Sequence, residues 1–444
     1  MKYSKNILAQ SLAILLTAGC SASQKQPAEE SQAPITDTGS SSEAISDISY
    51  EDLTPYVSDI DHMDIPPRKI IAFGEATHGN KDFTQLKMQI FKQLVSQQNI
   101  RAFAIEGDFG GCQKVNSYIQ NGVGTAEEAA GEIGFAIYKT QEMADLLEWM
   151  KGFNESQPLE NQIRFYGFDM QRYDNNKEEL FTLLDKTVPQ LSLKYQNALE
   201  DFTDDTMYDL KKATVEQLLD KLNTLNAELE DQKDLIISSS SPKEYDLIRQ
   251  YIKSIEANTQ LRIASSYGTV RDGFMAEYVS WILDFEEKYY GSKQIFITGH
   301  NGHIGKTTAT FGTKKVMGEI LADQYGEEYY AIGSEFYKSN FLAPDTMTGK
   351  RTEFEILNKG DERLALLLHQ AEIKMLFLDM KAASANPTLY EYLTAKQPIS
   401  SVGEGFSKAS ALMEKAYTQK LSPLLTYDGI VFVDSAEPSA MIQQ

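Results

Sequence analysis

Short apolar runs alternate with longer amphipathic segments along most of the chain. Seven runs have the length and the β-branched and aromatic content of strands. Helix-length segments lie between them, such as 82–98 (DFTQLKMQIFKQLVSQQ) and 141–154 (QEMADLLEWMKGFN). Strands that are apolar throughout need cover on both faces, so this pattern predicts an α/β fold with a mainly parallel sheet flanked by helices. The seven runs are KIIAF (69–73), RAFAI (101–105), IRFYG (163–167), QIFIT (294–298), YYAIG (329–333), KMLFL (374–378) and GIVFV (429–433).

The pattern changes between about residues 180 and 290. This region has no strand-like run and is dense in Leu, Lys, Glu and Asp. One apolar stripe repeats at alternating spacings of three and four, which is typical of packed helices, and we interpret it as core. The segment SPKE, from Ser241 to Glu244, predicts a capping box with proline at the first helical position. We therefore expect a helical hairpin or bundle inserted into the α/β domain. The stripe consists of Val215, Leu218, Leu222, Leu225 and Leu229.

Composition and charge narrow the classes of partner. The chain has 444 residues, of which 42% are hydrophobic, enough for one large domain or two smaller ones. Its formal net charge of -22 repels nucleic acid and anionic lipid head groups, and disfavours polyanionic substrates unless a local basic patch intervenes. We expect a monomer that binds a neutral or cationic small molecule and no nucleic acid.

The first 19 residues resemble an export signal. Lys2 and Lys5 precede the short apolar stretch LAQSLAILLTAG. The following TAGC resembles the bacterial lipoprotein cleavage box, although Thr17 stands where that box usually has leucine. This predicts an exported protein, anchored in the cell envelope by lipid on Cys20; a plain secretory signal is the alternative. The membrane is then a partner through this anchor.

The residues after Cys20 are expected to form a flexible tether. Residues 20–50 are rich in serine, and we place the α/β domain at 51–444, with the helical insertion at about 180–290. The only other cysteine is Cys112. If Cys20 carries lipid, the chain has no intrachain disulfide, and the fold depends on its core alone.

Polar residues follow the strands where ligands bind in parallel sheets, beyond the carboxyl ends. Three of the five histidines fall there, in the glycine-flanked segments GEATHG and GHNGHIGK; His62 and His369 lie elsewhere. Glycine permits positive φ and close backbone approach, which a site needs more often than a plain connection does. We therefore expect a functional site at these ends. In strand order the polar residues are Glu75 and His78; Glu106 and Asp108; Asp169 and Arg172; His300 and His303; Glu335; Asp379; and Asp434.

These residue types allow more than one chemistry. A histidine with a carboxylate partner can activate water, and a second histidine can protonate a leaving group or stabilise an oxyanion. Glutamate and histidine are also zinc or manganese ligands, so Glu75, His78, Glu106 and His300 form an alternative metal site. HIGKTT fails as a phosphate loop because the first glycine is misplaced. No GxSxG segment accompanies these motifs, which favours direct attack by water over an acyl-enzyme.

Several segments together resemble the erythromycin esterase family. The similarity runs from about residue 50 to the C-terminus and is carried by these blocks: IAFGEATHGNKDFTQLKMQIFKQLV, RAFAIEGDFG, TQEMADLLEWMKGFN, IRFYGFDMQ, VRDGFMAEYVSWIL and ITGHNGHIG. The resemblance implies an α/β domain with a helical insertion and a deep cleft between them. It also implies hydrolysis of a macrolide lactone in the family's resistance enzymes, without a cofactor.

The resemblance also implies roles for individual residues. The general base would be His78, supported by Glu75 and Glu106, with His300 and His303 as the second histidine pair. Lys87 stands where the resistance enzymes have arginine, and the two are not interchangeable at a forked site. Arg271, in VRDGFMAE, matches a family arginine reached from the helical part; its alternative is a surface ion pair with Asp272 or a neighbour.

We expect an exported lactone or ester hydrolase in which Arg271 and Lys87 bind or polarise the substrate carbonyl. Two alternatives remain open at this point. One is a metal-dependent envelope hydrolase of unknown substrate that uses the same residues as ligands. The other is an envelope binding protein that kept the cleft and lost catalysis. Membership of the family does not by itself transfer the substrate.

Overall fold

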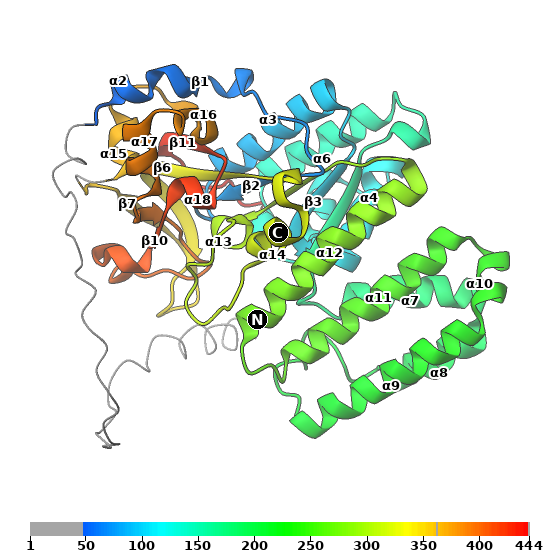
Figure 1. Ribbon diagram of the computed structural model, residues 1–444. Coiled ribbons are helices and arrows are strands. Elements are labelled where there is room, and N and C mark those ends of the chain that lie inside the picture. Colours follow the sequence, from blue (N-terminus) through cyan, green and yellow to red (C-terminus); the bar gives the residue numbers. More distant parts are fainter. Residues whose placement is uncertain (1–47, 361–362, 443–444) are drawn as a thin grey trace, which may run out of the picture.

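The computed structural model describes residues 48–360 and 363–442 (Figure 1). Within them, nine strands form one sheet in the order β1-β8-β11-β6-β2-β5-β3-β4, with β7 beside β6, and β9 and β10 pair separately. The strands are β1 Val57–Ser58, β2 Ile70–Glu75, β3 Ala102–Asp108, β4 Arg164–Asp169, β5 Ile295–His300, β6 Tyr329–Pro344, β7 Arg351–Leu357, β8 Met375–Asp379, β9 Gln397–Ser400, β10 Thr418–Leu421 and β11 Gly429–Ala436.

All seven apolar runs form strands, and the α/β prediction is confirmed. The six strands from β11 to β4 in the sheet order are parallel, whereas β8 runs antiparallel to β11. Asp379, at the end of β8, lies opposite Gly429 at the start of β11. The expectation that Asp379 shares the carboxyl edge with the other candidates is therefore wrong, because its strand points the other way.

Alternate residues of the central strands enter two separate cores. In β2, Ile70 and Ala72 pack into one apolar cluster, while Ile71 and Phe73 pack into the other. Each cluster is completed by helices on its own side of the sheet, since successive side chains of a strand point to opposite faces. Burial on both faces explains why these strands are apolar throughout.

Helices connect and cover the strands. Both segments predicted as helices form one: 82–98 lies within α3, and 141–154 coincides with α6. The α-helices are α2 Tyr50–Leu53, α3 Lys81–Gln98, α4 Phe109–Asn121, α5 Ala126–Glu132, α6 Gln141–Asn154, α7 Asp174–Thr187, α8 Pro189–Ala198, α9 Lys212–Asp231, α10 Lys233–Ser239, α11 Pro242–Leu261, α12 Tyr267–Tyr290, α13 Asn301–Ile304, α14 Met317–Tyr325, α15 Leu364–His369, α16 Met380–Ala383, α17 Pro387–Thr394 and α18 Pro423–Thr426.

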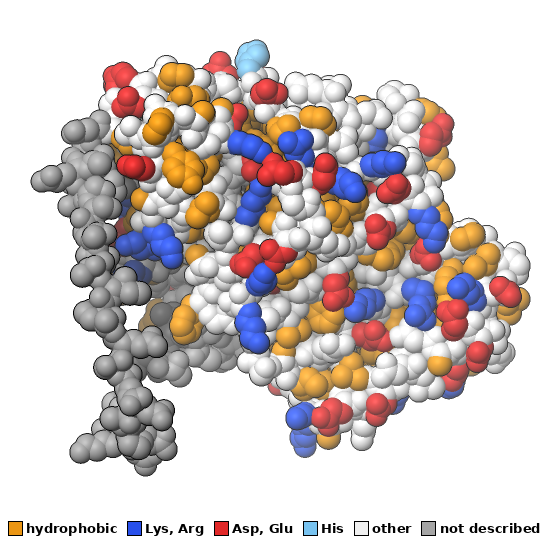
Figure 2. Space-filling view, viewed as in Figure 1, with side chains coloured by type: hydrophobic (Ala, Val, Ile, Leu, Met, Phe, Trp, Pro, Cys, Tyr) orange, Lys and Arg blue, Asp and Glu red, His pale blue; other side chains and the backbone are white. Residues whose placement is uncertain are grey.

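The segment between β4 and β5 forms a helical subdomain of α7 to α12, the green part of Figure 1. The whole predicted apolar stripe lies on α9 and is buried. The Ser241 hydroxyl accepts a hydrogen bond from the Glu244 backbone N–H at 3.1 Å and caps α11 as predicted. The Glu244 carboxylate contacts the Ser241 hydroxyl rather than its backbone, so the box is half made. Over the visible face of this subdomain, basic and acidic side chains are interspersed (Figure 2).

The predicted signal (1–19), Cys20 and most of the predicted tether (20–50) lie outside the described residues. Only residues 48–50 of the predicted tether belong to the described part of the chain, and α2 begins there at Tyr50. None of the helices in the described part of the chain combines the length and the apolar composition needed to cross a membrane.

Candidate active site

The first predicted pair lies where β2 ends. Glu75 is the last residue of β2, and its side chain is buried. Its Oε1 accepts a hydrogen bond from His78 Nδ1 at 2.8 Å, and its Oε2 accepts one from Lys87 Nζ at 2.6 Å. Burial acts to raise the pKa of Glu75, but the charge of Lys87 and the contact with His78 outweigh it, and the pKa is lowered. Glu75 is therefore an ionised partner that orients His78.

His78 keeps one ring nitrogen open. Its Nδ1 is bound to Glu75, and no contact within the described residues involves its Nε2. Burial alone would lower the pKa of His78, but Glu75 and the charges of Glu106 and Glu404 raise it overall. A neutral His78 with Nδ1–H directed at Glu75 presents a lone pair at Nε2, the arrangement of a general base.

His300 has no nitrogen left for chemistry. Its ring lies 4.9 Å from that of His78, centroid to centroid. Its Nδ1 accepts from the Gly302 backbone N–H at 3.2 Å, and its Nε2 donates to the Val402 carbonyl at 3.1 Å. Burial, together with the charge of His78, lowers the pKa of His300 to about 3. His300 is a neutral wall of the site, and it also caps the short helix α13.

Glu106 reaches the site from an irregular strand end. The pairing of β3 with β4 shifts register between Ile105 and Asp108, a bulge of the kind that re-aims side chains beside active sites. Glu106 Oε2 accepts from the His300 backbone N–H at 2.8 Å. A Cβ on Gly299 would stand 2.9 Å from that oxygen, so glycine at 299 makes room for Glu106.

None of the glycines in the two histidine motifs has a positive φ. Their common feature is close packing against the backbone or against side chains. A Cβ on Gly79 would lie 2.1 Å from the Leu342 carbonyl oxygen, so the backbone would have to move to admit any other residue. Of the two reasons for glycine given by the sequence, close approach is the one that the structure shows.

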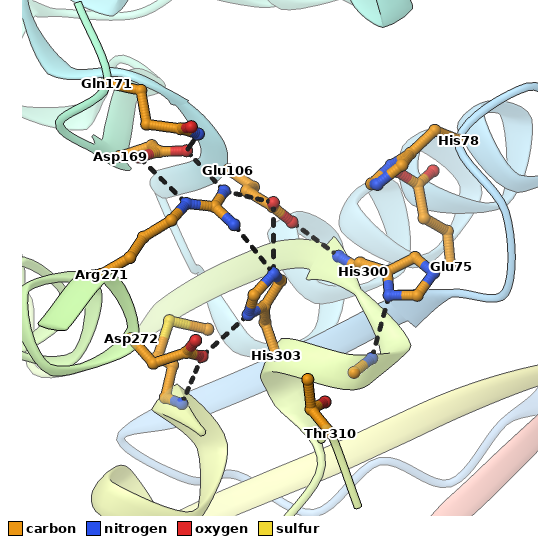
Figure 3. A network of polar contacts seen from close by, with 12 residues as sticks. Glu75, His78, Glu106, Asp169, Gln171, Arg271, Asp272, His300, His303 and Thr310 are labelled. Carbon is orange, nitrogen blue, oxygen red and sulfur yellow. Dashed lines mark hydrogen bonds and ion pairs between the residues drawn. The ribbon is translucent and has the colours of Figure 1, made fainter. Parts of the chain in front are cut away.

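Arg271 ties the second histidine to the sheet edge (Figure 3). From α12, its Nη2 donates to Glu106 Oε1 and to Asp169 Oδ2, both at 2.6 Å. Its Nη1 lies 3.0 Å from His303 Nε2, and His303 Nδ1 lies 2.7 Å from Asp272 Oδ1. The alternative of a surface pair with Asp272 is wrong, since the guanidinium is largely buried and its carboxylate partners are Glu106 and Asp169.

These contacts favour the charged form of Glu106, of His303 and of Arg271. Burial acts to raise the pKa of Glu106, but His303 and Arg271 lower it well below its usual range. Burial acts to lower the pKa of His303, but Asp272 and Glu106 raise it overall. The pKa of Arg271 rises because Asp169 and Glu106 outweigh its burial. The cluster is a closed set of ion pairs in which each charge has a partner.

Both clusters face a cavity of about 330 Å³. The open nitrogen of His78 is therefore beside a space large enough for part of a small molecule. Neither Glu75 nor Lys87 is among the lining residues; Lys87 is 1% exposed and binds Glu75 behind the cavity wall. The cavity is lined by His78, Glu106, Phe135, Ala136, Ile137, Asp169, Gln171, Arg172, Tyr208, Arg271, His300, His303, Gly403 and Glu404.

Some strand-end candidates lie away from this cavity. Glu335 is buried and accepts from the Ser400 backbone N–H, and Asp434 pairs with His369 beside Tyr337. Asp108 caps α4, and burial raises its pKa to about 7. Conversely, Tyr208 and Glu404 line the cavity without any motif in the sequence to mark them.

The proposed metal ligands do not fit a metal site. Both oxygens of Glu75 and both ring nitrogens of His300 are engaged by protein partners. Among residues 48–360 and 363–442, no group of three or more His, Cys, Asp or Glu side chains is arranged to hold a metal ion. Lys306, from the rejected phosphate-loop segment, pairs with Asp428 and does not line the cavity.

Known proteins of similar sequence and fold indicate the family. The chain is 21% identical over 406 residues to the Bacillus subtilis (strain 168) protein YbfO, whose name classes it as a hydrolase, covering 85% of each chain. It is 22% identical to the erythromycin esterase type II of Escherichia coli, covering 71% of this chain and 80% of the relative. A crystal structure of a Bacillus cereus protein shares the fold, with a TM-score of 0.75, 23% identity and coverage of 90% and 95%.

The family model named erythromycin esterase matches residues 95–436. This span includes Glu106, Asp169, Arg271, His300 and His303. Glu75 and His78 lie before this span, and they add a carboxylate-oriented histidine to the site. The chain belongs to the erythromycin esterase family and is a hydrolase of that type.

Proposed function

We propose that this hydrolase opens a lactone or cleaves a related ester of a small molecule by water that His78 activates. One observation carries the proposal. Of the three histidines at the cavity, His78 alone has a ring nitrogen with no partner in the described structure. The other two have both nitrogens engaged. A general base needs such a free lone pair within reach of water.

The reaction then runs in two steps. His78 Nε2 takes a proton from water while the water oxygen forms a bond to the carbonyl carbon, and the carbonyl oxygen becomes an oxyanion. Glu75 stabilises the imidazolium through the hydrogen bond to Nδ1. The bond to the leaving oxygen then breaks, and His78 returns its proton to that oxygen. A lactone gains one water and opens; an ester gives an acid and an alcohol.

Arg271 provides the positive charge for the oxyanion in this proposal. It lines the cavity and is held between Glu106 and Asp169, so its position does not depend on the substrate. A fixed charge of this kind needs no reorganisation as the oxyanion forms. Lys87 is 1% exposed and contacts Glu75, which supports a positioning role in place of the substrate contact expected from the sequence.

The substrate and location extend the proposal. The net charge of -22 favours a neutral or cationic substrate, of which a macrolide lactone is one example. From the predicted signal and Cys20 we further propose that the protein is anchored in the cell envelope by lipid, and we expect it to act there as a monomer. Either a drug that crosses the envelope or an envelope metabolite would meet the enzyme there.

The test incubates the purified protein with a panel of macrolides, simple lactones and esters, and measures product masses. We expect one added water on at least one lactone, or an acid and an alcohol from an ester. The His78→Asn variant should give no product, whereas His62→Asn, at an exposed histidine outside the cavity, should match the parent. Full turnover by His78→Asn would reject the mechanism, and no product from any carboxylic ester or lactone would reject the substrate class.

A further inference from the structure

Three loops on one side of the cavity combine exposed apolar tips with unpaired lysines. They are residues 306–316, 345–351 and 403–420, here called the basic loop surface. We propose that the basic loop surface docks onto an anionic lipid bilayer. The docking itself does not depend on the proposed esterase activity. The consequence of docking for substrate delivery rests on the proposed function.

The tips of these loops carry unusually exposed apolar side chains. Phe311 is 88% exposed, and Met347 and Leu412 are each 87% exposed. Among the large hydrophobic residues of the described chain, no other exceeds 64%. Each of the three loops carries one of them. Single exposed apolar residues are ordinary, but the three extremes on neighbouring loops indicate a surface that another phase covers.

The three loops are in contact with one another. The Thr346 backbone N–H donates to the Phe406 carbonyl at 2.9 Å, which joins the second loop to the third. Gln419 Nε2 donates to Thr310 Oγ1 at 3.3 Å, which joins the third loop to the first. The first loop also contacts the start of α12, where the Lys314 backbone N–H donates to Thr269 Oγ1 at 3.0 Å. The segments that carry Phe311, Met347 and Leu412 are therefore joined to one another.

The charge of this surface is opposite to that of the chain. Its three segments contain eight Lys and Arg against three Asp and Glu, whereas the whole chain has a net charge of -22. The acidic members are Asp345, Glu404 and Glu414; Asp345 accepts from two backbone N–H groups, and Glu414 pairs with Arg363. The lysines with no ion pair among the described residues are Lys314, Lys350, Lys408, Lys415 and Lys420.

The overall negative charge does not prevent such docking. At physiological ionic strength the Debye length is about 8 Å, so only charges that face the bilayer act on it. Lysines around exposed apolar tips are the combination by which peripheral proteins bind anionic interfaces. The lysines would also attract single-stranded nucleic acid, but its binding relies on bases stacking on successive aromatic side chains, and among the three tips only Phe311 is aromatic.

Docking would bring the cavity to the lipid surface. Gly403 and Glu404 line the cavity and begin the third loop of the basic loop surface. If the proposed function holds, the substrate is then an ester or lactone that partitions into the bilayer and enters the cavity from it.

The decisive test places a reporter at one tip. The parent for this test is the full chain with Cys20→Ala, which removes the predicted lipid site. The reporter variant adds Phe311→Trp to this parent. The fluorescence of the parent, which comes from Trp149 and Trp281, is subtracted from that of the reporter. Vesicles of phosphatidylcholine mixed with phosphatidylglycerol should shift the emission to the blue, and lipids brominated near the head group should quench it. Pure phosphatidylcholine or high salt should weaken both effects. Leu159→Trp, at a 64% exposed site elsewhere, is the matched control and should not respond.

A second comparison measures partition onto the same vesicles. Replacing Phe311, Met347 and Leu412 together by serine should lower the partition coefficient at least about tenfold. The same change at Val123, Leu159 and Leu193, which are 58–64% exposed, should leave it unaltered. Hydrolysis of a water-soluble ester should be unchanged in both triple variants. Equal responses of the two reporters, or equal partition of the two triple variants, would overturn the docking surface even if the hydrolase is active. An inactive hydrolase with the expected fluorescence would instead reject only the proposed function.

Discussion

Two histidines of the site have nearly identical carboxylate partners and different chemistry. His78 Nδ1 lies 2.8 Å from Glu75, and His303 Nδ1 lies 2.7 Å from Asp272. In both, burial acts to lower the pKa and the carboxylates raise it overall. The difference is at Nε2, which is open in His78 and lies 3.0 Å from the Arg271 guanidinium in His303.

This difference shows how one type of residue pair takes two roles. In the open cluster of Glu75, His78 and Lys87, Lys87 binds Glu75 and Glu75 orients His78. The other ring nitrogen of His78, Nε2, stays free, and His78 lines the cavity. In the second cluster Arg271 joins Glu106, Asp169 and His303, which satisfies its partners and makes a rigid wall. A general base needs the open arrangement, and a fixed electrostatic support needs the closed one.

The largest effect is expected from removing the open nitrogen. His78→Asn should lower kcat/KM by about 10²–10⁴-fold, the usual contribution of a general base. His303→Asn should lower it much less, because it removes no free lone pair. The thermal unfolding midpoint of His78→Asn should stay near that of the parent, which shows that the fold is intact. Equal losses of activity in the two variants would remove the distinction between the clusters.

The next largest effect is expected from opening the closed cluster. Arg271→Met leaves Glu106 and Asp169 buried with less compensation, and breaking a buried ion pair typically costs about 3–5 kcal/mol. Urea unfolding should show this loss, together with reduced kcat. Arg271→Lys keeps the charge but not the forked geometry, so its stability should lie between that of the parent and that of Arg271→Met. Unchanged stability of Arg271→Met would show that the cluster is not a structural support.

Lys87 tests the support of the open cluster with a smaller change. Lys87→Met leaves Glu75 without one partner but with His78 still bound, so we expect a loss of about 1–3 kcal/mol in unfolding free energy. The kcat should fall, because Glu75 orients His78 less firmly, while KM changes little. Lys87→Arg should recover part of kcat. A rise in KM alone would instead indicate the substrate contact that the sequence suggested.

The strands could be predicted because each is buried on both faces and reads as a continuous apolar run. Their direction could not be, since the run that forms β8 would read the same in either orientation. The sequence therefore predicts the wrong edge of the sheet for Asp379. The order of β2, β5, β3 and β4 brings Glu75, His300, Glu106 and Asp169 to one edge, and neighbours in a sheet are chosen by packing that no local pattern records.

The candidate residues could be identified by glycine and histidine at strand ends, but their roles could not. Whether His78 or His303 is open depends on Arg271, which arrives from α12 on a separate subdomain. Tyr208 and Glu404 enter the cavity from segments without a motif. These are long-range contacts, and they decide which nitrogen, charge or surface is free.

The mildest test of the comparison is the dependence of activity on pH. His78 must be neutral at Nε2 to accept a proton, and its pKa is raised above the ordinary 6.5 of histidine. Acidification through that pKa protonates the base, so kcat/KM should fall by about tenfold per pH unit below a midpoint that lies above 6.5. The pKa of His303 is also raised, so the profile alone does not assign the midpoint. The variant His303→Asn decides between the two histidines. If His78 is the base, the midpoint of the pH profile should persist in this variant. If the midpoint disappears, His303 is the group that titrates and the role of base belongs to it.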